Sequence, residues 1–455
     1  MKGGGTKVKK ARIFVTLVTV LLVTFTLFAE EKVLKVSTEQ MTSLDVPFVV
    51  SFSELLDFVG YDFDANWNSI RIKDSKGKDL PYQIVDVDQN GRISSPDFLL
   101  FVFKNEANIV VSDDWDLDLL QFEPAFTIEE KDGEYNVVNK NFTVKVNNHG
   151  LANFTKFGNV EGILYNELGT ARIAGWSGST YYVDGKLGKH VETTSMGLTV
   201  KDLKVFDPGP VAVTVQGVLS YEELPGLTQK ITTYIFKTGD VLVENEFSFS
   251  NYVDIMKLQV MATAPLTTVD DGSLHITPMF RRVIWAEQLG ITPYEYWKER
   301  GAVEIVDENA YVVFPAIDSM KPLWWGATYA FVSMEDWRAN FSEKYGLIAA
   351  EILPQTSVVY SDLKKFVYND FWFYESREFR DGIFRWIPGE LNNYEATKGT
   401  FDGTNEADWM MKLKAGDEVT YTRYFSIYSA KNTVEAIKLL EGRAHEIQNL
   451  KLIVQ

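Results

Sequence analysis

Cysteine is absent from all 455 residues of the chain, and histidine occurs only four times. Without cysteine the protein has no disulfide bonds, no lipid-modified cysteine anchor and no thiol nucleophile, so packing and bound metal are left to stabilise it outside the cell. The sequence also has no glycine-rich phosphate loop, no dinucleotide fingerprint and no His-Glu-x-x-His motif. These absences argue against a nucleotide-binding enzyme and against that class of zinc protease.

Positive charge is scarce as well. The chain has 45 lysines and arginines against 63 aspartates and glutamates, which is a formal net charge of −18. A field of this sign repels nucleic acid and anionic membrane surfaces. We therefore expect no nucleic-acid partner and no membrane partner for the mature protein.

The N-terminus departs from this charge balance. Five positive charges lie in the first twelve residues, and an apolar run from Ile13 to Phe28 ends at Ala29. This is the plan of a secretory signal peptide, so we expect residues 1–29 to be removed and the protein to be secreted or to lie in the periplasm or cell envelope. The alternative is an uncleaved membrane anchor, although the run of 16 residues is shorter than the roughly 20 that span a bilayer.

Aromatic residues make up 14% of the chain, which argues against a disordered acidic protein. Strand signals recur along the chain, and no long helical segment appears before the C-terminus. We therefore predict a mainly β protein with a small β-domain at residues 30–125, a polar boundary at 122–135, a large antiparallel β-sandwich at 136–430 and an amphipathic helix at 431–455. The oligomeric state stays open.

Two segments support this prediction most directly. The strand at 241–250 alternates apolar and polar residues, and it is expected to pair with 229–236 across a glycine-containing turn. Asn432 and Glu435 form a helix start of the capping-box type. One face of that helix is apolar, through Val434, Ile437, Leu440, Ala444 and Ile447. We expect this face to dock on the sandwich, and the alternative is a partner-binding helix.

Residues 86–97, with the sequence DVDQNGRISSPD, match a twelve-residue calcium loop. Ca²⁺ takes about six to eight oxygen ligands, and few short segments offer so many. Gly91 stands where such a loop turns sharply. The groups at ligand positions 1, 3, 5, 7, 9 and 12 are Asp86, Asp88, Asn90, the main-chain carbonyl of Arg92, Ser94 and Asp97.

The flanks of this loop differ from those of a helix–loop–helix calcium hand. Residues 80–85 and 98–103 are apolar and β-prone, and Pro81 argues against a helix before the loop, so we expect the loop to join two strands. Asp97 replaces the longer Glu at the last position, which makes bidentate closure less assured. The alternative is a polar hairpin turn without metal, because Asp, Asn and Gly also dominate turns.

Candidate groups for proton transfer lie in two parts of the sandwich segment. A reaction that removes a proton next to a carboxylate needs a base, an acid and a cation that holds the carboxylate. The residues that can supply these roles are His190, Tyr181, Tyr182, Arg281 and Arg282. The alternative for each histidine, including His275, which the arginine pair follows closely, is a structural role without a part in catalysis.

Aromatic and basic residues also gather in short stretches. The faces of Trp and Tyr stack on the C–H faces of sugar rings, and a nearby arginine binds hydroxyl or acid groups. The candidates for substrate binding are Trp176, Trp285, Trp324, Trp325, Trp372, Tyr374 and Arg377. The alternative is that these aromatics belong to the core, because aromatics are enriched in strands.

The order of features resembles that of a known group of proteins. Leu80 to Gln83 precede the candidate calcium loop, and Asp207 to Val215 precede the strand signals at 234–249. This order resembles secreted bacterial proteins with the galactose-mutarotase-like β-supersandwich, including families associated with polysaccharide breakdown, over about residues 33–250. No catalytic signature transfers residue by residue.

The resemblance implies a carbohydrate ligand, either a polysaccharide or an oligosaccharide. The leading hypothesis is a polysaccharide lyase that acts on a uronate-containing glycan, with calcium either structural or bridging an acidic sugar. The alternative is a non-catalytic glycan-binding or cell-envelope protein, which needs no active constellation.

Overall fold

The structure is a computed structural model that describes most of the chain from residue 31 onward. The described residues are 31–38, 44–60, 67–113, 117–177, 189–192, 198–222, 224–251, 253–260, 265–278, 283–285, 292–299, 301–316, 329–335, 337–354, 367–368, 371–376, 384–387, 390–392 and 411–454. The predicted signal peptide lies outside them. Within these ranges, no helix is long and apolar enough to cross a membrane.

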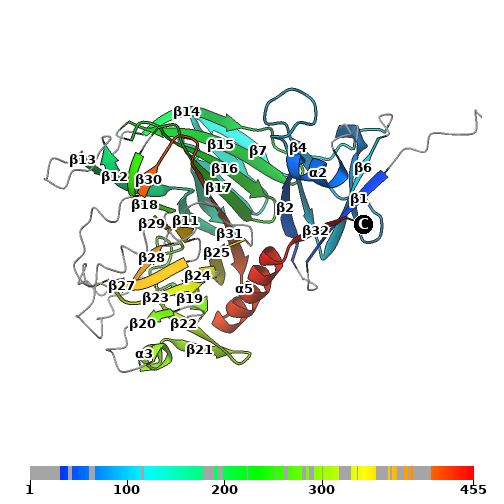
Figure 1. Cartoon of the computed structure of the whole chain (residues 1–455). Coiled ribbons are helices and arrows are strands. Elements are labelled where there is room, and N and C mark those ends of the chain that lie inside the picture. The colour runs from blue at the N-terminus through cyan, green and yellow to red at the C-terminus, as the bar shows by residue number, and fades with distance from the viewer. Residues whose placement is uncertain are drawn as a thin grey trace, which may run out of the picture.

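The protein is mainly β, as predicted, and its strands pair in antiparallel sheets. Figure 1 shows the N-terminal strands in blue on the right, the long green strands beside them in the upper part of the view and the red C-terminal helix below both. The N-terminal unit and the central sheet are therefore neighbours, and the chain returns to the N-terminal unit at its C-terminal end.

Two small sheets form the N-terminal unit. One has the order β3 (Ile70–Asp74), β6 (Glu106–Ser112), β1 (Glu31–Ser37) and β32 (Lys451–Val454). The other has the order β2 (Val46–Ser51), β5 (Phe98–Phe103) and β4 (Tyr82–Val85). A short helix, α2 (Phe52–Val59), follows β2, and the 3-10 turn η1 (Trp67–Ser69) precedes β3.

Strand β5 is buried on both faces, as its continuous apolar run predicted. Leu99 and Phe101 belong to the core of the N-terminal unit, whereas Leu100 and Val102 pack in the core that the unit shares with the central sheet. The strand therefore joins the small unit to the large one through its alternating side chains.

The central sheet has ten strands. Its order is β14 (Leu198–Val205), β15 (Ala212–Tyr221), β16 (Leu227–Phe236), β17 (Asp240–Phe249), β31 (Glu418–Ser429), β25 (Leu347–Ile352), β24 (Trp337–Ser342), β19 (Leu274–Pro278), β22 (Asn309–Pro315) and β21 (Val303–Val306). The predicted hairpin between β16 and β17 is present, and its partners run from Leu227 opposite Phe249 to Ile235 opposite Val241.

Three further sheets and two helices complete the described fold. One sheet has the order β11 (Val160–Leu168), β10 (Ala152–Phe157), β9 (Phe142–Val146), β8 (Glu134–Val138) and β7 (Thr127–Lys131). The next has the order β13 (Lys189–Glu192), β12 (Ala171–Ser177), β18 (Val253–Val260), β29 (Glu390–Asn392) and β26 (Val367–Tyr368), with β30 (Met411–Leu413) also on β18. The last has the order β20 (Val283–Trp285), β23 (Tyr329–Glu335), β27 (Phe371–Ser376) and β28 (Phe384–Ile387). The helices are α3 (Pro293–Glu299) and α5 (Thr433–Gln448).

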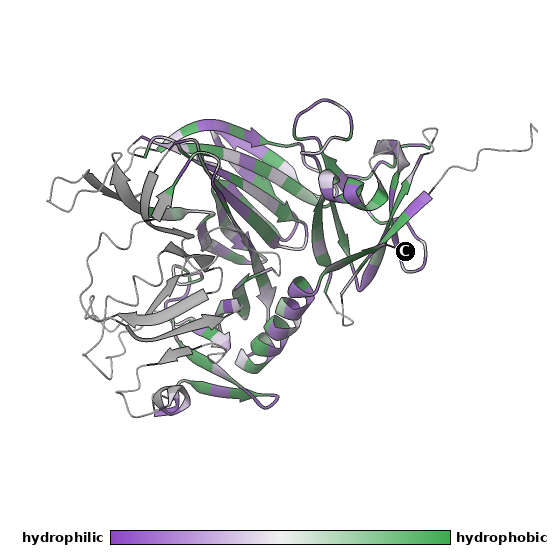
Figure 2. Ribbon diagram, in the orientation of Figure 1, coloured by the Kyte–Doolittle hydropathy of each residue, from purple (hydrophilic) through white to green (hydrophobic). Residues whose placement is uncertain are grey.

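The central sheet buries both of its faces, against different partners. Val241 and Val243 of β17 pack with the sheet β7–β11, whereas Leu242 packs on the side of α5 and the N-terminal unit. The predicted alternation along this strand is confirmed, because its apolar residues are buried and Glu244 and Glu246 keep some exposure. Figure 2 shows hydrophobic and hydrophilic residues alternating in the same way along the central strands and α5.

The segment 122–135, predicted as a polar boundary, contains strand β7 and the start of β8, joined by a tight turn in which Asp132 and Gly133 adopt positive φ. The predicted extent of the C-terminal helix is wrong. The helix ends at Gln448 rather than at the chain end, and residues 451–454 form the edge strand β32 on β1. This error arises because the edge of β1 was available for pairing, which the sequence of the last residues does not show.

The start of α5 was predicted correctly. The side chain of Asn432 accepts a hydrogen bond from the backbone N–H of Glu435 at 2.9 Å. Four of the five predicted apolar positions are buried, but Val434 is 39% exposed in the first turn. This turn lies before the part of the helix that meets the sheet.

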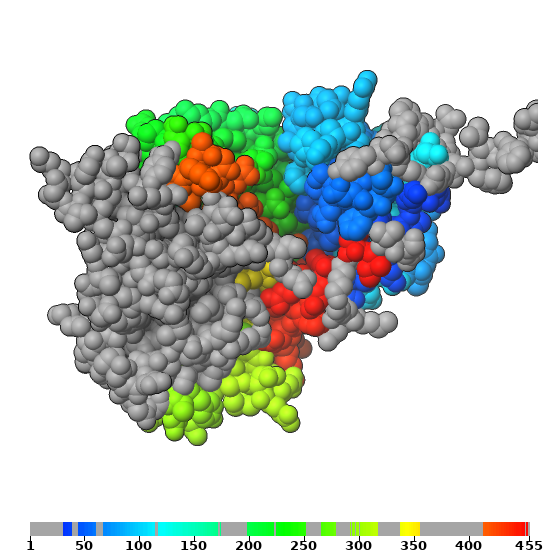
Figure 3. Space-filling model, in the orientation of Figure 1, coloured from blue at the N-terminus to red at the C-terminus, as the bar shows by residue number. Residues whose placement is uncertain are grey.

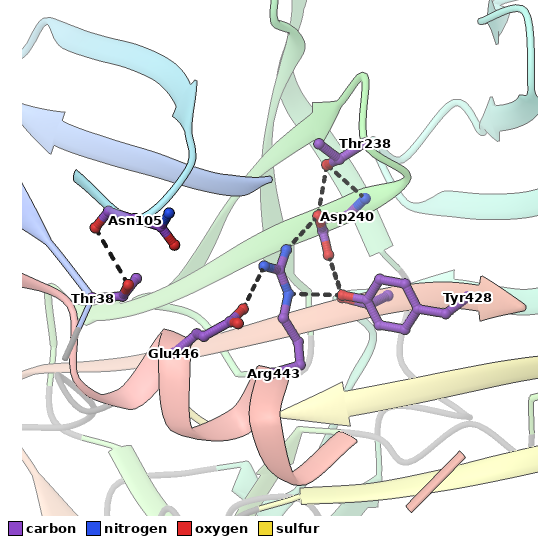
Figure 4. A network of polar contacts seen from close by, with 8 residues as sticks. Thr38, Asn105, Thr238, Asp240, Tyr428, Arg443 and Glu446 are labelled. Atoms are coloured by element: carbon purple, nitrogen blue, oxygen red, sulfur yellow. Dashed lines mark hydrogen bonds and ion pairs between the residues drawn. The ribbon is translucent and has the colours of Figure 1, made fainter. Parts of the chain in front are cut away.

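A buried ion pair holds α5 on the central sheet (Figure 4). Arg443 donates to Asp240 on β17 at 2.8 Å and to the Tyr428 hydroxyl on β31 at 2.9 Å. Thr238 and Ser426 also donate to Asp240, and Glu446 accepts from Arg443 at 3.2 Å. Burial acts to raise the pKa of Asp240, but Arg443 and these donors outweigh it and hold the pKa below the ordinary value. The helix is therefore fixed by charge as well as by apolar packing.

Candidate functional site

The candidate metal loop is the hairpin connection between β4 and β5, as predicted. Val85 pairs with Phe98 at the base of the loop, so residues 86–97 project from the N-terminal unit as one closed turn. Carboxylate oxygens of Asp86, Asp88 and Asp97 all lie within 4.8 Å of one another. This spacing is compatible with one cation bound by all three carboxylates.

Backbone donors orient the carboxylates of the loop. Asp86 accepts from Gly91 N at 2.9 Å, and Asp97 accepts from Val87 N at 2.9 Å and Ser94 N at 2.8 Å. Gly91 has a φ of 72°, which suits the sharp turn expected at this position. Because Asp97 is fully buried at the end of the loop, its position depends little on solvent.

The other predicted ligands lie around this cluster in different ways. The Ser94 hydroxyl donates to both Asp88 and Asp97, at 3.0 and 2.9 Å. The Asn90 amide nitrogen donates to Asp88 at 2.8 Å, while its oxygen accepts from Arg92 N at 2.7 Å. The fold thus brings together three carboxylates and a hydroxyl, and it turns the Asn90 oxygen to the backbone.

The predicted catalytic residues are only partly described. The backbones of Trp176 on β12 and His190 on β13 pair directly, so the structure brings these two positions together. The remaining candidates of that set, Tyr181, Tyr182, Arg281 and Arg282, lie outside the described residues.

The predicted aromatic positions fall partly in one small sheet. Trp285 on β20 and Tyr374 on β27 flank β23, opposite Phe331 and Val332 respectively, and Trp372 lies two positions before Tyr374. Three of the predicted sugar-binding positions are thus neighbours in the sheet. Trp324, Trp325 and Arg377 lie outside the described residues.

A row of buried polar side chains crosses the central sheet on the face opposite α5. The row, called the polar row below, takes one residue from each of seven adjacent strands: Tyr221, Gln229, Asn245, Arg423, Glu351, Arg338 and His275. All seven are between 1% and 6% exposed. Burying this many polar and charged groups costs free energy unless they are hydrogen-bonded or serve a ligand.

The first half of the polar row is a hydrogen-bonded chain. Tyr221 donates to the Gln229 oxygen, and the Gln229 nitrogen donates to Asn245 at 2.7 Å and to the Gly169 carbonyl at 3.1 Å. Burial raises the pKa of Tyr221 well above its ordinary value. This half is internally satisfied and serves to hold the strands in register.

The second half carries the charges. Arg338 and Glu351 are direct partners on β24 and β25, and Arg338 donates twice to one Glu351 oxygen, at 2.9 and 2.6 Å. Arg423 on β31 lies 4.0 Å from the other oxygen of the same carboxylate. Two guanidinium groups therefore flank one carboxylate in a layer with little solvent, where their electrostatic effect is strong.

His275 ends the row, opposite Asn340. Burial, together with the positive charge of Arg338, lowers the pKa of His275 to about 3. The imidazole is therefore neutral at physiological pH and has one nitrogen able to accept a proton. It packs on the ring of Phe314, with 5.2 Å between the ring centres.

Two acceptor oxygens in this half are buried without a hydrogen bond. Within the part of the chain that the structure describes, Glu351 Oε1 has no hydrogen-bond partner, and Asn340 Oδ1 lies against His275 without a hydrogen bond of ordinary geometry. Glu351 is 2% exposed and Asn340 is fully buried. A buried acceptor without a donor costs about 1–3 kcal/mol, so a water or another molecule that donates to these oxygens would recover free energy.

Sequence reasoning missed most of the polar row. Of its residues, only His275 is named from the sequence, together with the arginines that follow it. Arg338 and Glu351 are not among the predicted site residues, although each is a lone charge in a strand that is otherwise buried. A charged residue within a fully buried strand was the available signal, and only strand pairing shows that the two meet.

Comparisons with known proteins give a fold likeness only. No family model and no curated protein sequence matches the chain. Similar solved structures include a glycosyl hydrolase family 38 protein from Enterococcus faecalis, at 8% identity and a TM-score of 0.35, covering 98% of this chain and 50% of that one. A galactose 1-epimerase from Lactobacillus acidophilus has 12% identity and a TM-score of 0.31, covering 68% of this chain and 100% of that one.

An α-N-acetylgalactosaminidase from Bifidobacterium bifidum has 9% identity and a TM-score of 0.34, covering 72% of this chain and 38% of that one. The chain thus spans half or less of the two glycosidases. These similar structures include proteins of the galactose-mutarotase type, so the predicted fold resemblance is found, although it is weak. TM-scores this low say nothing about activity.

Proposed function

We propose that the protein is an exported carbohydrate-active protein and that the charged half of the polar row takes a saccharide ligand. The observation that carries the proposal is the pair of buried acceptors, Glu351 Oε1 and Asn340 Oδ1, beside two guanidinium groups. Each sugar hydroxyl is both a donor and an acceptor. A layer that offers carboxylate and amide acceptors next to arginine donors matches that chemistry.

The leading catalytic form of this proposal is a lyase acting on a uronate-containing glycan. In such a reaction a base removes the proton next to the uronate carboxylate, the electron pair forms a carbon–carbon double bond, and the bond to the leaving oxygen breaks as that oxygen gains a proton. Arg338 or Arg423 suits the carboxylate. His275, whose pKa is lowered to about 3, is too weak a base for the proton step, so the proton steps are assigned to His190 with Tyr181 or Tyr182.

A glycan-binding protein without catalysis is the second candidate. It is favoured by the internally satisfied half of the polar row, which resembles a rigid scaffold more than a reactive site. Product formation separates the two. Uronate-rich polysaccharides incubated with the protein should yield unsaturated products, detected by ultraviolet absorbance, if the lyase form is correct. No product from any of them excludes the lyase and leaves binding.

The test of the shared proposal is Glu351→Gln, which keeps the shape of the side chain and removes its charge. Affinity for oligosaccharides, measured by calorimetry, should fall at least tenfold. The matched control is Asp240→Asn, which removes a buried, arginine-paired carboxylate on the opposite face of the same sheet. Equal affinities in the two variants would rule out a ligand at the polar row.

We also propose that residues 86–97 bind calcium. The carboxylate triad within 4.8 Å and the fully buried Asp97 support this proposal. Since a cation that binds only the folded state stabilises it, added Ca²⁺ should raise the unfolding temperature and a chelator should lower it. Asp86→Ala should abolish the Ca²⁺ response, and Asp79→Asn, an exposed carboxylate before β4, should keep it. No heat of Ca²⁺ binding in the unaltered protein would refute the site.

A further inference from the structure

The opposite face of the central sheet, which turns toward the N-terminal unit, carries a second set of polar groups. Thr214 on β15 and Tyr234 on β16 are direct partners, and Gln216 pairs with Thr232 one step along the same strands. The step after that places Lys230 opposite Glu246. These pairs make a polar track that runs along the strands and lies across the sheet from the polar row.

The inner end of this track has buried hydroxyls without ordinary hydrogen bonds. Tyr234 is fully buried and Thr214 is 1% exposed. Among the described residues, the Thr214 hydroxyl makes no hydrogen bond. The Tyr234 hydroxyl lies against the carboxyl of Glu244, without a hydrogen bond of ordinary geometry. Both are strong donors and acceptors, so a ligand or water that enters here gains two hydrogen bonds that the protein alone does not make.

The outer part of the track is open to solvent. Lys230 and Glu246 are each 41% exposed at their side chains, and Glu244 keeps partial exposure. Figure 3 shows green residues of this sheet set back between the blue N-terminal unit and the orange residues near position 415. The track therefore runs from an exposed ion pair at one end to buried hydroxyls at the other.

The N-terminal unit closes the inner end. Phe98 meets Tyr234 edge to face, with 5.8 Å between ring centres. Phe98 directly follows Asp97, the last residue of the candidate metal loop, so that loop lies beside the closed end of the track. Phe98 of the N-terminal unit therefore contributes to the burial of Tyr234.

The charges of the track select the ligand class. Glu244 and Glu246 bring two carboxylates against the single ammonium of Lys230, which already lies 3.5 Å from Glu246. This balance disfavours an anionic ligand. Burial raises the pKa of Glu244 to about 7, with Glu246 adding to the effect and Lys230 opposing it. The carboxyl is thus held in a partly dry place beside Tyr234.

We propose that this track is a second saccharide site, separate from the polar row, that takes a neutral oligosaccharide with one sugar unit reaching the Thr214 and Tyr234 hydroxyls. Hydroxyl, amide and carboxyl groups on a partly open track suit a ligand rich in hydroxyl groups and without charge. The inference does not depend on the polar row, because its residues face the other side of the sheet.

The test is the double variant Thr214→Val and Tyr234→Phe, in which both hydroxyls are lost and the shapes are nearly kept. The probes are cellotetraose, maltotetraose, mannotetraose and galactotetraose, titrated by calorimetry. The affinity of the tetraose that binds the unaltered protein should fall at least tenfold. The unfolding temperature of the ligand-free variant should stay equal or rise, because buried hydroxyls without ordinary hydrogen bonds are removed.

The matched control is Thr233→Val. Thr233 is buried, its hydroxyl also lacks a partner within the described ranges, and it lies next to Tyr234 but faces the other side of the sheet. Its affinity should equal that of the unaltered protein. Unchanged affinity in the double variant, a marked fall in its unfolding temperature, or no binding of any tetraose would overturn the proposal. Binding lost only in Glu351→Gln would place the ligand at the polar row alone.

Discussion

The neutral, buried His275 predicts a loss of stability in acid. Its pKa is about 3 in the folded protein, against an ordinary value of about 6.5 for an unfolded chain. Between about pH 3 and pH 6.5 the unfolded state therefore binds a proton and the folded state does not, so the free energy of unfolding falls as the pH drops below about 6.5. The free energy of unfolding stops falling only near pH 3, the pKa of the folded protein.

The size of the effect follows from the two values. At pH 5 the unfolded imidazole is about 97% protonated, which lowers the free energy of unfolding by about 2 kcal/mol relative to pH 8. Toward pH 3 the total approaches about 4–5 kcal/mol. The side chain is 6% exposed, so solvent screens little of it.

The assay is urea unfolding at pH 8, 6.5 and 5 at constant ionic strength, on the unaltered protein and on His275→Gln. The variant loses stability at every pH, but relative to the unaltered protein it should recover about 2 kcal/mol between pH 8 and pH 5. Thr277→Val is the control, since Thr277 is buried two positions along the same strand and does not titrate. Parallel pH curves for the unaltered protein and His275→Gln would refute a neutral, desolvated His275.

Three further predictions concern other residues of the central sheet and of α5. Glu244 has a pKa of about 7 in the folded protein against an ordinary 4.5, so its effect on stability is opposite to that of His275: the folded state takes up a proton first, and the free energy of unfolding rises as the pH falls from 7 to 4.5. In the same urea series, Glu244→Gln should be about 2 kcal/mol more stable than the unaltered protein at pH 8 and should lose that gain by pH 5. Arg443→Met leaves Asp240 charged and buried, so we expect a loss of about 3–5 kcal/mol by urea unfolding, with much of it restored in the double variant with Asp240→Asn; equal losses in both would contradict the pairing. Gly442 lies inside α5 with open space around its Cβ position, so Gly442→Ala should raise the free energy of unfolding by about 0.5–1 kcal/mol, and a fall would show that the helix is closely packed there.

The candidate metal loop shows how much of a site local sequence predicts. Its three carboxylates were predicted from spacing within twelve residues, and the two apolar flanks placed it between strands. Both predictions are local, because the loop closes on its own hairpin and the turn at Gly91 depends on neighbouring residues. Sequence spacing predicted the Asn90 oxygen as a metal ligand, but in the structure this oxygen accepts a hydrogen bond from the backbone N–H of Arg92.

The polar row shows where local sequence stops. Glu351 and Arg423 are 72 residues apart, and their contact exists because β31 lies between β17 and β25 in the central sheet. No periodicity in either strand predicts that order. The error at the C-terminus has the same origin, because β32 forms on the edge offered by β1, at the other end of the described chain.

The sequence by itself determined the elements: alternating side chains predicted the strands of the hairpin at 229–249, turn residues predicted where it reverses, and Asn432 predicted where the last helix begins. These features depend on residues within a few positions of each other, where backbone sterics and local hydrogen bonds decide the structure. The tertiary structure alone decided which strands became neighbours, and so placed Arg338, Glu351 and Arg423 in one buried layer and Tyr234 beneath Phe98. Such contacts depend on how distant apolar faces pack together, and that is a property of the whole chain.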